Sequence, residues 1–128
     1  MKFEGNHELP SLEFIADEGT LKIWGRSIAT SAKADFWDPL YDKMEEYLPG
    51  PRDIIFSLDL EYFATSSARA MMELFKLMER VSKDSDRKIL VKWFYDDEEM
   101  LEAGEDLISM VTKLEWKLVD KNDEKIDD

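Results

Sequence analysis

Apolar and polar residues alternate over two short runs near the start of the chain, 11–16 and 20–24. Leu12 and Phe14 alternate with polar neighbours in the first run, and Leu21 and Ile23 do so in the second. The segment between them contains Gly19, which suits a tight turn. Two alternating runs around such a turn predict a β-hairpin.

Beyond the hairpin the apolar pattern switches between helical and strand periods. Apolar residues recur at helical spacing over 35–48, 66–82 and 98–112, and the wide stripe on 66–82 predicts a helix lying flat on a sheet. Runs at 53–60 and 89–95 have the composition of buried strands, and 114–119 alternates like an edge strand. The order β-β-α-β-α-β-α-β predicts an α/β fold, a mixed sheet with parallel neighbours and helices packed on it.

The chain of 128 residues fits one domain, which we place at 9–119. Residues 1–8 carry no pattern and are expected to form a flexible N-terminal arm, while the acid-rich segment 120–128 is expected to be a frayed tail. The N-terminus does not resemble a signal peptide, and no apolar run reaches the roughly 18–20 residues of a membrane helix. A cytoplasmic location is therefore expected.

Charge and cysteine content remove several classes of function. The chain has 30 Asp and Glu and 17 Lys and Arg, which gives a net charge of −13. This negative charge disfavours nucleic acid and anionic membrane surfaces as partners. The absence of cysteine excludes disulfides, cysteine-ligated metal clusters and thiol nucleophiles. No cofactor is expected.

Three successive hydroxyl residues, Thr65, Ser66 and Ser67, stand where a buried strand gives way to a helix. One of them is expected to cap the helix, and three exceed what one cap needs. No acid follows in the first turn, and Arg69 lies four residues after Thr65, so this helix start suits a phosphate group. The competing interpretation is that the three hydroxyls only cap the helix. Tyr62 and Phe63 beside it fit either partner anchors or ordinary packing.

A second candidate site is acidic. Seven acids and no base fall within 96–106, which fits a divalent-cation site, a solvated helix start or a docking surface for a basic partner. The spacing is not that of an EF-hand. His7, the single histidine, lies outside any catalytic pattern. Among the four tryptophans, Trp37 is the candidate for the surface, and the others are expected in the core or at its edge.

Four stretches carry a resemblance to a known family. The main one is 60–75, where the hydroxyl triplet is followed by Ala70, Met71 and Met72; the others are 25–27, 45–48 and the strand ending 91–96. Together they resemble the SiaC family of bacterial regulatory phosphoproteins, STAS-like domains akin to anti-sigma-factor antagonists. The resemblance covers roughly 9–119.

The resemblance implies a regulatory switch with a STAS-like fold and no enzymatic activity. Its phosphoacceptor would be Thr65, with Ser66 and Ser67 in reserve, Arg69 supporting the phosphate, and Tyr62 and Phe63 meeting a partner. The implied partners are a serine/threonine kinase of anti-sigma-factor type, a metal-dependent serine/threonine phosphatase and a diguanylate cyclase, which the unphosphorylated form would activate. The alternatives are an anti-sigma-factor antagonist that controls transcription and a small metal-dependent hydrolase using the carboxylates of 96–106.

Overall fold

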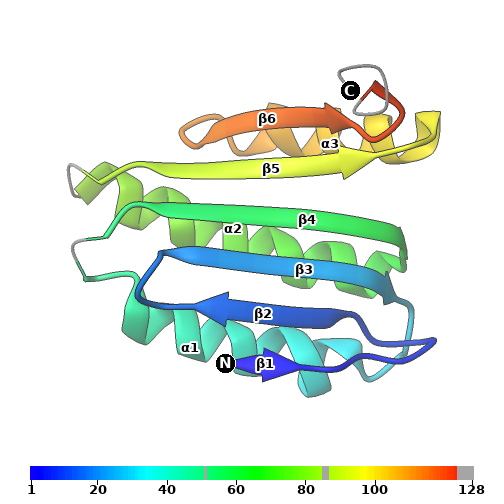
Figure 1. The fold of residues 1–128 in the computed structure, drawn as a ribbon, viewed down its shortest axis with the longest axis horizontal. Helices are drawn as coiled ribbons and strands as arrows, with labels where there is room; N and C mark the ends of the chain where they lie inside the picture. The colour runs from blue at the N-terminus through cyan, green and yellow to red at the C-terminus, as the bar shows by residue number, and fades with distance from the viewer. Residues whose placement is uncertain (51, 85–86, 124–128) are drawn as a thin grey trace.

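The computed structural model describes residues 1–50, 52–84 and 87–123 and has one six-stranded sheet (Figure 1). The elements in chain order are β1 Lys2–Phe3, β2 Ser11–Ile15, β3 Thr20–Ser27, the π-helical turn η1 Lys33–Trp37, α1 Asp38–Tyr47, β4 Ile54–Phe63, α2 Thr65–Asp84, β5 Ile89–Tyr95, α3 Glu98–Met110 and β6 Glu115–Asp120. The strands are arranged in the sheet in the same order as in the chain.

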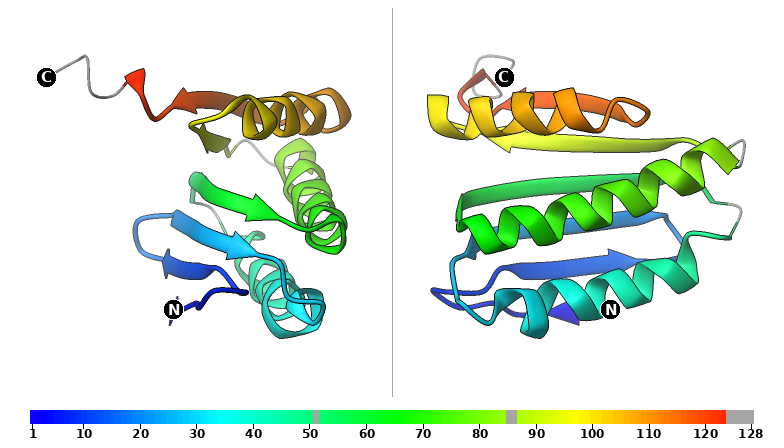
Figure 2. Two further views of the ribbon diagram at one scale, coloured as in Figure 1. Left: turned by 90° about the vertical axis from the view of Figure 1, so that its right-hand side faces the viewer. Right: turned by 180° about the vertical axis from the view of Figure 1, so that it is seen from behind.

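The sheet is antiparallel on one side and parallel on the other. β1, β2 and β3 pair antiparallel, whereas β3, β4, β5 and β6 pair parallel. Because each parallel connection moves one strand further in the same direction and crossovers share one hand, the three helices lie on the same face. Figure 2 shows α1, α2 and α3 together on one side of the sheet, in front of the strands in its right-hand view, and Figure 1 looks onto the face that they leave bare.

The core lies between the sheet and its helices. Alternate residues of each central strand point toward the helices and are buried, and the largest include Phe56 on β4 and Trp93 on β5. Trp37 is only 2% exposed, so the expectation that it reaches the surface is wrong. The π-helical turn directs its ring inward, where its indole nitrogen has a partner, as a buried tryptophan requires.

Most of the predicted elements are confirmed. The hairpin, three helices and three later strands occur within a few residues of their predicted bounds, the connected strands are parallel, and β6 is an edge strand. The first helix is preceded by η1, and β4 runs on to Phe63. Within the segment expected to be an arm, β1 pairs with β2 through Lys2 and Glu13. In the predicted tail Asp120 still belongs to β6, and residues 124–128 lie outside the described part.

Candidate functional site

The connection between β4 and α2 divides the three hydroxyl residues into one buried and two exposed. Ser67 is fully buried, and its hydroxyl lies 2.6 Å from the hydroxyl of Ser27 and donates to the Ser27 carbonyl at 3.0 Å. The Trp37 indole donates to the Ser27 hydroxyl at 2.9 Å. Ser67 therefore ties the start of α2 to the end of β3, and its hydroxyl is closed to a kinase in this conformation.

None of the three hydroxyls caps α2, contrary to the expectation from sequence. Because β4 ends at Phe63 and α2 begins at Thr65, Ala64 alone occupies the cap position. Its carbonyl accepts the backbone N–H groups of Ser67 and Ala68, each at 3.0 Å. The hydroxyl residues thus lie inside the first helical turn, and capping does not explain them.

Thr65 and Ser66 are both exposed. In the described part of the chain neither hydroxyl makes a hydrogen bond, and the first turn of α2 contains no acid. They line a hollow of about 380 Å³ together with Arg69 and Lys33. The predicted pair Thr65 and Arg69 is thus brought together, beside a helix start whose dipole favours an anion.

Lys33 is the member of this hollow that sequence reasoning missed. It comes from η1, 32 positions before Thr65, and nothing in its own sequence surroundings connects the two. Its ammonium donates to both carboxylate oxygens of Asp38, at 2.9 and 3.1 Å. That hydrogen bond raises the pKa of Lys33, whose ammonium is charged at neutral pH in any case. Both partners are about half exposed, which keeps this ion pair weak.

Tyr62 and Phe63 take different roles. At Gly25 the backbone has φ +104°, and the register between β3 and β4 shifts there. Beyond this bulge Tyr62 is 53% exposed beside the hydroxyls. Phe63 is half-buried, with its ring edge-to-face on Trp93 at 6.0 Å. Packing therefore accounts for Phe63, whereas Tyr62 is free to meet a partner.

A groove of about 540 Å³ extends from Thr65 and Arg69 along the outer side of α2. Its floor is apolar and includes Met72 of α2 and Met110 of α3, the latter 53% exposed. Arg69, Lys76 and Arg80 line the same groove with one acid, Glu73. A chain of net charge −13 thus presents a mainly basic, methionine-bearing groove next to its exposed hydroxyls. The residues come from three helices, so no sequence window reveals it.

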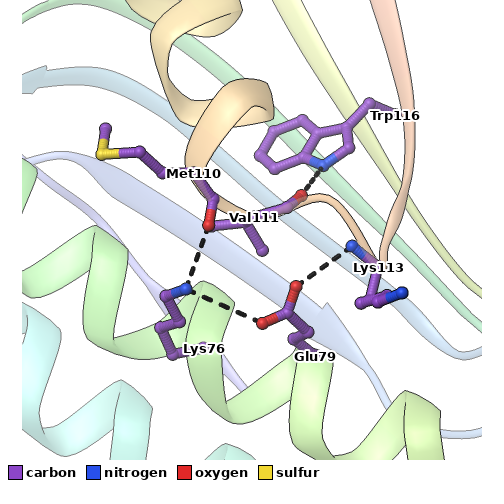
Figure 3. A network of polar contacts seen from close by, with 6 residues as sticks. All are labelled: Lys76, Glu79, Met110, Val111, Lys113 and Trp116. Atoms are coloured by element: carbon purple, nitrogen blue, oxygen red, sulfur yellow. Dashed lines mark hydrogen bonds and ion pairs between the residues drawn. The ribbon is translucent and has the colours of Figure 1, made fainter.

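Polar contacts fix the α3 side of this groove (Figure 3). Lys76 of α2 donates to the Met110 carbonyl at 3.0 Å and lies 3.8 Å from the Glu79 carboxylate. Glu79, itself buried, accepts the backbone N–H of Lys113 at 3.0 Å, and the Trp116 indole donates to the Val111 carbonyl at 2.9 Å. The end of α3 is therefore anchored on α2, and the groove has a fixed wall.

The first acids of the segment 96–106 stabilise the start of α3. Asp97 occupies the cap position, and its carboxylate accepts the Met100 N–H at 2.8 Å. Glu98 and Glu99 occupy the first turn, where the helix dipole favours acids. Among the described residues no three His, Asp or Glu side chains come together in a way that would hold a metal ion. The hydrolase alternative therefore has no site in the described part.

Fold and junction together define a small α/β domain with two exposed hydroxyls, a lysine and an arginine gathered at one helix start. The chain matches the model of the SiaC family, described as regulatory phosphoproteins, over residues 3–121 and belongs to that family. Family membership, rather than any missing catalytic group, makes it a regulatory protein and not an enzyme. No helix of the described part is long and apolar enough to cross a membrane.

Solved structures with the same fold come from Pseudomonas aeruginosa. SiaC in complex with the diguanylate cyclase SiaD, which it activates, is 24% identical, with a TM-score of 0.86, covering 94% of this chain and 98% of that one. A structure of SiaC alone is 23% identical, with a TM-score of 0.85 over 94% and 97% of the two chains. Apo-SiaC is 22% identical, with a TM-score of 0.83 over 93% and 97%. No curated protein matches the sequence.

Proposed function

We propose that this chain is a cytoplasmic, phosphorylation-controlled activator of a diguanylate cyclase, with Thr65 as its phosphoacceptor and Ser66 in reserve. A serine/threonine kinase of anti-sigma-factor type adds the phosphate, and a metal-dependent serine/threonine phosphatase removes it. The unphosphorylated form binds the cyclase. Membership of the SiaC family supports the regulatory part, and the SiaC–SiaD complex of P. aeruginosa supports the choice of partner.

One observation carries the choice of Thr65. Its hydroxyl is exposed and unbonded within the described residues, and it lines both the hollow with Lys33 and the groove along α2. Ser66 lines the hollow but not the groove. Ser67 leaves the proposal because its hydroxyl is buried in the contact with Ser27. A phosphate on Thr65 therefore reaches the groove, where a partner would sense it.

The groove is the surface that we assign to the cyclase. Its methionine floor adapts to an apolar helix face, and Arg69, Lys76 and Arg80 suit acids on the same helix. A phosphate on Thr65 brings about −1.5 to −2 charges to one end of this groove. Arg69, one helical turn away, then pairs with the phosphate instead of the partner. The added charge and its hydration weaken the complex.

The hollow gives the phosphate a second cation. Lys33 is held by Asp38 in a weak, solvent-exposed pair, and a phosphate with two negative charges is the stronger partner for an ammonium group. We expect phosphorylation to draw Lys33 from Asp38 toward Thr65. The modified helix start is then stabilised by Lys33, Arg69 and its own backbone N–H groups.

A reconstituted cyclase assay tests the proposal. The diguanylate cyclase of the source organism is assayed for cyclic-di-GMP formation with the wild-type chain, with Thr65→Glu and with Thr112→Glu. Thr112 is exposed in the turn after α3, so its variant controls for an added charge elsewhere. Wild type and Thr112→Glu are expected to stimulate the cyclase equally, and Thr65→Glu to stimulate it at least tenfold less.

Two results contradict the proposal at different levels. Equal stimulation by Thr65→Glu and wild type removes Thr65 as the switch. No stimulation by any of the three removes the cyclase as partner, and release of a sigma factor by the wild-type chain in the presence of the kinase then favours the anti-sigma-factor antagonist. Met72→Glu, which places a charge on the groove floor, separates the docking surface from the switch: it is expected to abolish stimulation while leaving Thr65 open to phosphorylation.

A further inference from the structure

The bare face of the sheet is unusual for strands that run parallel. Sheets built from parallel strands are generally covered on both faces, yet β3 to β6 are parallel and all three helices lie on one side (Figures 1 and 2). Large apolar side chains stand on the bare face: Trp24 is 42% exposed and Ile55 38%, and Leu90 and Phe94 are partly buried. This face is independent of the hydroxyl junction and of the groove along α2.

A row of lysines crosses the same face. Pairing places Lys22 of β3 next to Ser57 of β4, Ser57 next to Lys92 of β5, and Lys92 next to Lys117 of β6. We name this set of three lysines with Ser57 between them the lysine row. At the usual spacing of about 4.8 Å between strands, it extends for about 14 Å.

The lysine row is a charge anomaly. The chain holds 30 acids against 17 bases, yet in the described part none of these three lysines forms an ion pair. Lys92 and Lys117 stand directly opposite each other, and like charges in that position destabilise a sheet. Glu13 of β2, which forms an ion pair with Lys2, stands opposite Lys22, so Lys92 and Lys117 are the charges that folding does not explain. An anionic partner gives a reason for these two lysines.

Apolar walls border the lysine row. A hollow of about 280 Å³ beside it is lined by Lys22, Ser57, Asp59, Trp24 and Phe94. Asp59 is already neutralised there, because Lys121 donates to its carboxylate at 2.9 Å. The face thus offers free positive charge next to a site for a large apolar side chain. That combination matches a polypeptide segment in which carboxylates alternate with apolar residues.

A second copy of the chain fits poorly. A two-fold face-to-face dimer sets the same patch against itself, so lysines of the row that lie near the axis would meet their own copies. Nucleic acid fits poorly as well, since a phosphate backbone gains nothing from the apolar side chains of Ile55 and Leu90. We propose that the bare sheet face binds an acidic segment of another protein, whose carboxylates pair with the lysine row while an apolar side chain enters the hollow between Trp24 and Phe94.

Titration of the full chain followed by NMR tests this proposal. The probe is the random copolymer of glutamate and tyrosine in a four-to-one ratio, with poly-L-glutamate and poly(U) as comparison anions. We expect the copolymer to shift the backbone amide signals of Lys22, Ser57 and Lys92, and poly-L-glutamate to bind more weakly because it lacks apolar groups. Lys92→Glu should weaken copolymer binding about tenfold, as reversing a charge in a close pair does.

The control is Lys43→Glu, which makes the same charge change at an exposed position on α1, on the helix side of the sheet. It should change the affinity less than twofold, and Thr65→Glu should leave it unchanged, which separates this result from the cyclase proposal. Trp24→Ser provides a second variant if Lys92→Glu does not fold. The proposal is overturned by an absence of shifts on β3 to β5, by equal weakening in Lys43→Glu, by tighter binding of poly(U), or by self-association through this face in light scattering.

Discussion

Two strands of this sheet run into helices at the same edge, and their helix starts are built in opposite ways. Where β5 leads into α3, Asp97 caps the helix through the Met100 N–H, and Glu98 and Glu99 fill the first turn. Where β4 leads into α2, Ala64 stands at the cap position, and the first turn holds hydroxyls and no acid. One helix start carries its own negative charge, and the other lacks it.

If Thr65 is the phosphoacceptor as proposed, the comparison indicates what the unmodified helix start requires. A helix start favours a nearby anion by about 0.3–1 kcal/mol at the surface, and α3 already has its anions. The α2 start forgoes that stabilisation and keeps Arg69 and Lys33 beside two free hydroxyls. A phosphate on Thr65 would supply to α2 the negative charge that Asp97, Glu98 and Glu99 supply to α3. The two helix starts therefore respond differently to the same substitutions.

The largest expected effect separates the three hydroxyls. Ser67→Asp puts an unpaired carboxylate into the buried contact with Ser27, and we expect a loss of about 3–5 kcal/mol of folding free energy. Urea denaturation measures it. Ser66→Asp, one position earlier and exposed, is the matched control and should not destabilise the protein. Similar losses in both variants would mean that the two serines are not buried to different degrees.

A smaller effect is expected when the side chains at the starts of α3 and α2 are each truncated to alanine. Asp97→Ala removes a side-chain cap and should cost about 1 kcal/mol. Thr65→Ala removes a hydroxyl that caps nothing and should change stability by less than about 0.5 kcal/mol. Both variants are compared by urea denaturation at one pH. If Thr65→Ala costs as much as Asp97→Ala, the Thr65 hydroxyl has a structural role, and its assignment as a free phosphoacceptor weakens.

The smallest expected effect comes from a substitution that adds the missing negative charge to the start of α2. Thr65→Asp puts a carboxylate into the first turn of α2, and it should stabilise the protein by about 0.3–1 kcal/mol in low salt. Because the effect is electrostatic at the surface, it should shrink in 1 M salt. Thr65→Asn has nearly the same shape without the charge and serves as control. Equal stability of the two variants in low salt would show that the α2 start does not favour an anion.

Local pattern predicted most of this fold and only part of its site. The helix at 66–82 and the strands at 53–60 and 89–95 follow from periods that each segment carries by itself. The strand β1 was missed because two residues hold no period, and its pairing with β2 arises only once the hairpin exists. The burial of Trp37 was missed because the π-helical turn η1, which turns its ring inward, has no sequence signature that we recognised.

In the candidate site, too, local features were predicted and long-range contacts were not. The hydroxyl triplet and Arg69 lie within five residues, so sequence brought them together. The sequence alone did not show which of Thr65, Ser66 and Ser67 is buried, because the contact that buries Ser67 joins it to Ser27, 40 positions away. Lys33 and the groove along α2 were invisible for the same reason: their members come from separate helices and meet only in the folded chain.

The most direct test of the switch is to map phosphate on the chain purified from its native host. Trypsin cleaves after Arg52 and Arg69, so one peptide carries Thr65, Ser66 and Ser67 together with Ser57, and fragmentation separates the four positions. The structure predicts one phosphate, on Thr65, that disappears in Thr65→Ala while the protein stays folded. A phosphate on Ser67, or one that persists on this peptide at full occupancy in Thr65→Ala, would contradict the assignment of Thr65 as the switch.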